Sequence, residues 1–267
     1  MTVALEARNG MVRLAYEVRG SGAPLLLVHG LGYARWGWEP VLDPFAERFR
    51  VVAFDNRGVG ESDAPPGPYT ARVLAEDAVA VLDAAGIDRA HVVATSLGGM
   101  AAQELAVGWP GRVERLVLAC TTPGGAQAYP MPDQTVRLLA EVPFLQQEIA
   151  LRRLVENALS PGAPEALVER ILAYRLASPP DPAGWQAQAA AGMSFDGADS
   201  LGEIRAPTLV LHGTEDAVVD QRNAELLAAG IPNAQLVFFR GTGHLFFWEQ
   251  PERFTQVVAE FLTNETR

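Results

Sequence analysis

Short apolar runs recur along the first and last thirds of the chain, and most are followed by a segment with helical spacing of its apolar residues. A run without polar alternation predicts a strand that is covered on both faces. Strands are expected around such runs at 24–28, 51–54, 92–93, 115–119, 207–211 and 235–239. Strands that alternate with helices indicate a parallel sheet with helices on both sides, so the fold class is α/β.

The N-terminal segment has a different pattern. Residues Val3–Ala7 and Met11–Val18 flank Asn9-Gly10, a dipeptide that suits a tight hairpin because both residues tolerate positive φ. Helices are predicted from apolar spacing and from stop signals such as Gly86. Their expected ranges are 38–48, 69–85, 99–109, 223–229 and 251–262.

The middle of the chain lacks apolar strand runs. Between residues 121 and 200 the spacing instead predicts helices at about 134–141, 146–159, 164–177 and 182–193, separated by prolines and glycines. We therefore expect a core domain made of residues 1–120 and 201–267, with residues 121–200 inserted as a helical cap.

Composition narrows the class of function. The chain has 267 residues, is 49% hydrophobic and carries a formal charge of −11, and all 21 basic residues are arginines. An acidic chain is a poor candidate for nucleic-acid binding. Without lysine, neither Schiff-base chemistry nor a Walker-type phosphate loop can be built.

The expected compartment and partners follow from the cysteine content, the N-terminal segment and the length of the apolar runs. Cys120 is the single cysteine, so no intramolecular disulfide is possible. The charged N-terminal segment lacks the pattern of a signal peptide, and no apolar run approaches the ~18 residues of a membrane span. We expect a cytoplasmic protein with a small-molecule substrate and no membrane or nucleic-acid partner; its oligomeric state stays open.

Ser96 lies in a strand–turn–helix segment, Ala94-Thr95-Ser96-Leu97-Gly98. A serine at the apex of such a turn is exposed, and small neighbouring residues let the strand and the helix pack closely. The free N–H groups of the helix start favour developing negative charge beside it. Ser96 is therefore the candidate nucleophile.

A serine nucleophile needs a base and an acid that orients the base. Of the four histidines, only His244 lies in a loop near the C-terminus, before the last helix. Asp216 follows the 207–211 strand and falls between Ser96 and His244 in chain order, which is the order of such triads in α/β folds. Asp220 is the alternative acid, although it could instead cap the following helix.

Two backbone N–H groups would complete an acyl-transfer site. We expect them from Leu97, directly after the nucleophile, and from Leu31 in the turn His29-Gly30-Leu31-Gly32. No metal or cofactor is expected. The four histidines are scattered, and Arg35 occupies the third small position of a dinucleotide-binding pattern.

The chain resembles the α/β-hydrolase superfamily in five motifs that run in the family's order. They are HGLG at 29–32, FDNRGVGESD at 54–63, ATSLGG at 94–99, LHGTED at 211–216 and GTGHLFFWEQPERF at 241–254. The resemblance implies a Ser96–Asp216–His244 triad and a Leu31/Leu97 oxyanion hole. Within this superfamily, the chain is most similar to small bacterial esterases, enol-lactonases and cofactor-free haloperoxidase-like members. Ala94 and Thr95 depart from the usual elbow, and Ser96 stands where epoxide and haloalkane hydrolases have aspartate.

These observations predict a serine hydrolase that cleaves small, mostly apolar carboxylic esters or lactones. The alternatives are a small-molecule receptor that retains the triad with little turnover, and a C–C bond hydrolase or perhydrolase. No arginine lies near Ser96 or His244 in sequence, so uncharged substrates are expected. The expected pocket residues are bulky apolar side chains, namely Trp36, Trp38, Met131, Phe144, Trp185, Met193 and Phe246.

Overall fold

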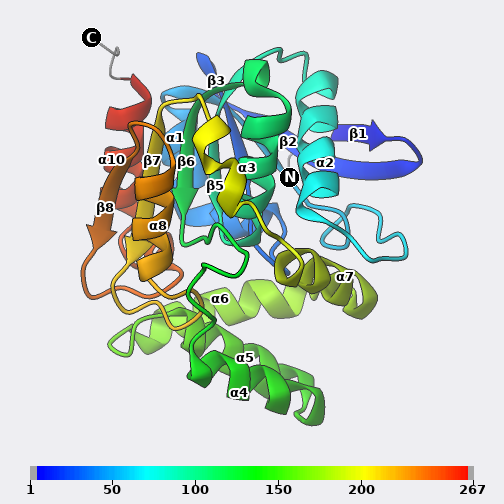
Figure 1. Ribbon diagram of the computed structural model, residues 1–267. Helices are drawn as coiled ribbons and strands as arrows, with labels where there is room; N and C mark the ends of the chain where they lie inside the picture. The colour runs from blue at the N-terminus through cyan, green and yellow to red at the C-terminus, as the bar shows by residue number, and fades with distance from the viewer. Residues whose placement is uncertain (1–4, 264–267) are drawn as a thin grey trace.

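The computed structural model describes residues 5–263, which form one eight-stranded sheet flanked by helices (Figure 1). The strands are β1 (Leu5–Asn9), β2 (Val12–Arg19), β3 (Ala23–Val28), β4 (Phe49–Phe54), β5 (Ala90–Thr95), β6 (Val113–Ala119), β7 (Thr208–Gly213) and β8 (Gln235–Phe239). Their order across the sheet is β1-β2-β4-β3-β5-β6-β7-β8. The pairings are parallel from β4 to β8 and antiparallel on either side of β2.

Helices cover both faces of the sheet, as the sequence predicts (Figure 1). One face packs on α1 (Glu39–Ala46) and α10 (Pro251–Thr263), and the other on α2 (Ala71–Ala84), α3 (Leu97–Gly108) and α8 (Arg222–Gly230). Within β3, Leu25 and Leu27 face the first layer, whereas Leu26 and Val28 face the second. All four are essentially buried, which explains the unbroken apolar run.

The observed elements follow the expected ones with small shifts at their ends. The expected 38–48 helix begins as a 3-10 turn, η1 (Arg35–Trp38), and continues as α1. The expected first strand starts at Val3, which lies outside the described residues, and β1 begins at Leu5. The short helix α9 (Phe246–Glu249), directly after His244, was not predicted because its run of aromatic residues has no helical periodicity of its own.

The segment between β6 and β7 is helical, and it lies beyond the edge of the sheet at which β5 ends (Figure 1). It contains α4 (Asp133–Glu141), α5 (Gln147–Ala158), α6 (Glu165–Ala177) and α7 (Pro182–Met193), followed by the 3-10 segment η4 (Ala198–Glu203). All four helices predicted between residues 121 and 200 are therefore confirmed, and the division of the chain into a core domain and a cap stays a prediction. No helix among the described residues is long and apolar enough to cross a membrane.

The start of α3 packs very tightly against the end of β3. A Cβ added to Gly98 would lie 2.3 Å from the carbonyl oxygen of Val28 and 2.6 Å from that of His29. Both contacts are to backbone, which cannot swing aside as a flexible side chain could. Gly98 is thus required by space, and the close crossing it permits fixes where α3 begins.

We expect Gly98→Ala to lower the free energy of unfolding by about 2 kcal/mol or more, since overpacking against backbone forces the strand and the helix apart. Gly111→Ala is the matched control, because a Cβ at Gly111 meets no atom within 4 Å. Urea unfolding of both variants measures the effect. Equal stability of the two variants would contradict this account of the β3–α3 contact.

Candidate active site

Ser96 connects β5 to α3 in an unusual backbone conformation, with φ 53° and ψ −123°. A non-glycine residue with positive φ is strained and persists only where the surrounding structure holds it. Three contacts do so here. Its N–H donates to the Ala119 carbonyl, its own carbonyl accepts from Thr121 Oγ1, and Gly30 lies so close that a Cβ there would be 2.8 Å from Ser96 Cβ. Ser96 is half-buried.

His244 and Asp216 are brought together by the loops after β8 and β7. His244 Nδ1 lies 2.7 Å from Asp216 Oδ2, a distance typical of a hydrogen bond between an imidazole N–H and a carboxylate. The loops themselves are in contact, since a Cβ at Gly213 would lie 2.2 Å from the Gly243 carbonyl oxygen. With Nδ1 donating to the acid, Nε2 of His244 is left as the basic nitrogen.

The Asp216 carboxylate is buried and held from several sides. Oδ1 accepts hydrogen bonds from the N–H groups of Val218 and Val219, while Nε2 of His212 lies 3.1 Å from Oδ2. Burial alone would raise the pKa of Asp216, but the charge of His244 and the hydrogen bonds from both histidines outweigh it and lower the pKa. The carboxylate is therefore ionised and rigid, as an orienting acid must be.

Asp220, the alternative acid, has a different role. It accepts hydrogen bonds from the backbone N–H and the guanidinium of Arg222 at the start of α8, and it makes none to His244. The side-chain hydrogen bond from Arg222 lowers its pKa. The structure thus favours Asp216 over Asp220 as the partner of His244.

The remaining histidines are framework residues. His212 is fully buried in β7 and its Nε2 donates to the Val219 carbonyl, and His91 packs edge-on against Phe49 at the start of β5. His29 accepts a hydrogen bond from the Gly30 N–H through Nδ1 and stacks on Tyr33 at 4.7 Å between ring centroids. Burial lowers the pKa of His29 to about 3, so it stays neutral and cannot serve as a proton-shuttling base near pH 7.

The two expected oxyanion donors lie beside the nucleophile. Leu97 is the first residue of α3, where backbone N–H groups have no partner within the helix, and Leu31 follows Gly30, which contacts Ser96. Neither N–H is hydrogen-bonded to another described residue. Both are therefore free to donate to a ligand.

Gln188 is a site residue that the sequence did not reveal. It is fully buried on α7, and its Oε1 accepts a hydrogen bond of 2.9 Å from the Gly32 N–H. Its Nε2 donates to the Arg57 carbonyl at 2.7 Å. The Gln188 side chain thus connects two segments: the turn after β3, which contains Leu31, and the loop after β4.

Several expected pocket residues are placed elsewhere. Trp38 and Phe246 are fully buried in the core on the face of the sheet that α1 and α10 cover. The expectation that they line a pocket is therefore wrong. Phe144 and Met193 are almost completely exposed, and Met131 is also exposed, which does not suit the walls of a closed apolar cleft. The apolar character of these five residues did not distinguish the core from the surface.

The two other expected pocket residues are half-buried. Trp36 stacks on Tyr174 of α6 at 5.3 Å between ring centroids, and Trp185 of α7 lies against Gly32. Both therefore lie where the cap meets the turn after β3, and they remain candidates for contact with substrate.

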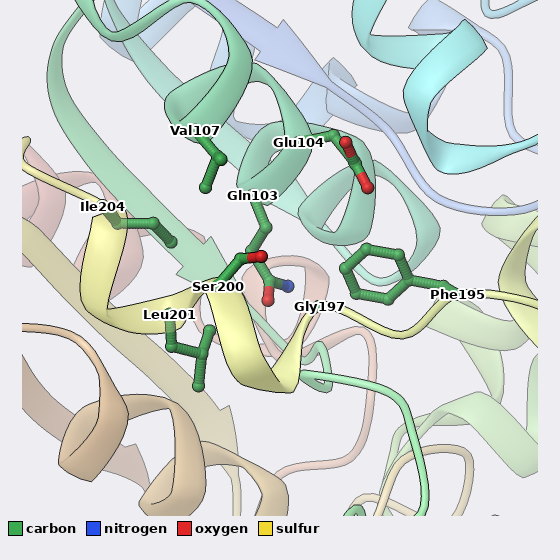
Figure 2. Close-up of a pocket in the computed structure, with 8 residues that line it drawn as sticks. All are labelled: Gln103, Glu104, Val107, Phe195, Gly197, Ser200, Leu201 and Ile204. Atoms are coloured by element: carbon green, nitrogen blue, oxygen red, sulfur yellow. The ribbon is translucent and has the colours of Figure 1, made fainter.

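A small cavity lies away from these residues, between α3 and η4 (Figure 2). Its volume of about 30 Å³ equals one water molecule, and Gln103 on its wall has a buried Oε1 without a partner. It is too small for an organic substrate. No group of three or more residues able to hold a metal ion occurs within residues 5–263.

The elbow at Ser96, the histidine–carboxylate pair and the sheet order occur together in one known family, and residues 23–251 match the family model described as the alpha/beta hydrolase fold. The chain belongs to the α/β-hydrolase family. It is a hydrolase with the fold that the five motifs predicted.

Similar proteins differ in the substrates that their names give. A hydrolase of known structure from Pseudomonas aeruginosa is 33% identical, with a TM-score of 0.85 and coverage of 98% of both chains. The N-acyl homoserine lactone-degrading enzyme Est816 is 31% identical, with a TM-score of 0.82 over 96% of this chain and 100% of its own. A 2-hydroxy-6-oxononadienedioate hydrolase from Paraburkholderia xenovorans is 31% identical over 98% of this chain and 94% of its own length.

The neutral state of His29 makes stability depend on pH. Its pKa is about 3 in the folded protein and about 6.5 in an unfolded chain, so the unfolded state binds the extra proton between these values. Stability from this residue is complete above about pH 6.5 and decreases as the pH falls. The expected contribution to the slope approaches 1.4 kcal/mol per pH unit below about pH 6.

Urea unfolding of wild type and His29→Asn between about pH 7 and pH 5 measures this contribution. Asparagine keeps an oxygen that can accept from the Gly30 N–H but does not titrate. The difference in unfolding free energy between the two proteins should shrink, or reverse, as the pH falls. A difference that is constant with pH would show that folding leaves the pKa of His29 at its unfolded value, which would contradict the lowered pKa.

Proposed function

We propose that the protein is a serine hydrolase that cleaves small carboxylic esters or lactones through an acyl-enzyme on Ser96. The observation that carries this proposal is the hydrogen bond of His244 Nδ1 to the buried Asp216 carboxylate, together with the strained left-handed backbone of Ser96. These three residues follow β8, β7 and β5, whose carboxyl ends lie at one edge of the sheet. That edge is where ligands bind in open α/β folds.

In the first half of the reaction, Ser96 Oγ attacks the carbonyl carbon while Nε2 of His244 takes the hydroxyl proton. The new C–O bond moves the carbonyl electron pair onto oxygen, and the N–H groups of Leu31 and Leu97 would stabilise this oxyanion. When the tetrahedral intermediate collapses, the bond to the leaving alkoxide breaks and His244 returns the proton to it. Asp216 holds the imidazole in the required tautomer throughout.

In the second half, water attacks the acyl carbon and gives its proton to His244. The bond to Ser96 then breaks, the acid is released and the proton returns to Ser96 Oγ. A lactone follows the same steps, except that its leaving group stays attached to the product. The name of Est816, a lactone-degrading enzyme, supports this class of substrate.

A second candidate is hydrolysis of a C–C bond. The Paraburkholderia relative is named for an oxo-dienedioate, a ketone without an ester bond, so water must break a C–C bond in it. The same triad can serve both reactions, and a receptor with little turnover could also retain it. Steady-state turnover of p-nitrophenyl esters separates a catalyst from such a receptor.

Covalent labelling tests the nucleophile directly. A fluorophosphonate should modify Ser96 alone, because only an activated serine attacks its phosphorus at a useful rate. Mass spectrometry of the digested protein would locate the adduct, with Ser96→Ala as the unlabelled control. An adduct on another residue, or no adduct on folded wild type, would overturn the acyl-enzyme proposal.

The three triad positions should lose activity unequally. Ser96→Ala and His244→Ala should reduce kcat on the order of 10⁶-fold, and Asp216→Ala on the order of 10⁴-fold, since the acid orients the base but does not react. Asp220→Ala is the matched control and should retain wild-type activity because its carboxylate pairs with Arg222. An inactive Asp220→Ala beside an active Asp216→Ala would reassign the acid.

A further inference from the structure

Arg175 brings a positive charge to the turn that carries Leu31. It lies on α6 of the cap, is only 4% exposed and places its guanidinium over the Tyr33 ring, 4.4 Å from the centroid. Its Nη2 is 3.5 Å from the position that a Cβ on Gly32 would occupy. Gly30, two residues earlier on the same turn, is the residue that contacts Ser96.

This buried charge has no anionic partner in the part of the chain that the structure describes. Arg175 forms no ion pair or hydrogen bond there, and its Nε is buried without an acceptor. Arg57, the comparable buried arginine, makes two hydrogen bonds to Asp77 at 2.6 Å. A buried guanidinium without a carboxylate is costly, and contact with an aromatic face offsets only part of that cost.

A second unused donor lies beside it. The indole Nε1 of Trp185 is 3.1 Å from the same Cβ position at Gly32 and makes no hydrogen bond to any described residue. Both nitrogen atoms thus lie within 3.5 Å of one position beside Gly32, and Cδ1 of the same indole lies 2.8 Å from it, so the indole already fills that position. Two donors without partners among the described residues, one from α6 and one from α7, therefore lie next to the same glycine, and a carboxylate bound over them could accept from both.

We propose that Arg175 and Trp185 form a subsite for a carboxylate on the substrate, remote from the bond that is cleaved. The inference rests on the proposed function and deepens it: the substrate is a small ester or lactone whose apolar acyl part ends in a carboxylate. The planar guanidinium matches the two oxygens of a carboxylate. The expectation of uncharged substrates considered only arginines near Ser96 and His244 in sequence, and Arg175 reaches the site through the fold.

The test compares two p-nitrophenyl esters of equal chain length, the hydrogen glutarate and the valerate, which differ in a terminal carboxylate or methyl group. Wild type should have the higher kcat/KM for the glutarate. In Arg175→Met the ratio of glutarate to valerate kcat/KM should fall about 10- to 100-fold, the effect expected for a lost hydrogen-bonded charge pair. Arg170→Met is the matched control, because it removes an exposed guanidinium from the same helix and should keep the wild-type ratio.

Inhibition of wild type by valerate, compared with valeramide, gives a measurement that does not depend on folding of the variant. Competitive inhibition by the carboxylate alone supports the subsite. A wild-type preference for the neutral ester, or an unchanged ratio in Arg175→Met, overturns it while turnover and Ser96 labelling keep the proposed function intact. Inhibition by chloride equal to that by valerate would show a site for inorganic anions and would also overturn the carboxylate subsite. If wild type neither cleaves the two esters nor is labelled at Ser96, the proposed function itself is wrong.

Discussion

The steric contact between the turn after β3 and the start of α3 determines the geometry of the whole site. Neither Gly30 nor Gly98 has space for a Cβ, because Ser96 and the backbone of β3 fill it. This contact helps to hold Ser96 at positive φ and joins it to the start of α3 at Leu97. Ser96 and the proposed N–H donors of Leu31 and Leu97 therefore lie in two adjoining turns, and packing around Ser96 maintains its strained backbone.

Charge in this site is controlled by burial as much as by pairing. Asp216 stays ionised because two histidines and two backbone N–H groups face its carboxylate. His29, equally buried but without a carboxylate, has its pKa lowered by burial and is neutral. His29 and His244 both follow the carboxyl ends of strands, but only His244 contacts a carboxylate. This difference explains why His29 is neutral framework while His244 is paired with an acid.

The sequence predicts the framework well, because its signals are local, and the catalytic roles that it assigns to Ser96, Asp216 and His244 stay predictions. The apolar runs identify the strands, and the loop positions of Ser96 and His244 distinguish them from residues within elements. The pocket was less predictable, since Trp38 and Phe144 are equally apolar yet one is core and the other surface. Gln188 could not be predicted at all, because its meaning depends on Gly32, 156 residues away.

The hydrogen bond between Gln188 and Gly32 connects the turn after β3 to α7. A displacement of α7 large enough to admit a substrate would withdraw the acceptor from Gly32 and release the turn from the Arg57 loop. The turn after β3 is therefore held in place only while α7 is packed against it. A single amide side chain joins three segments that are distant in sequence.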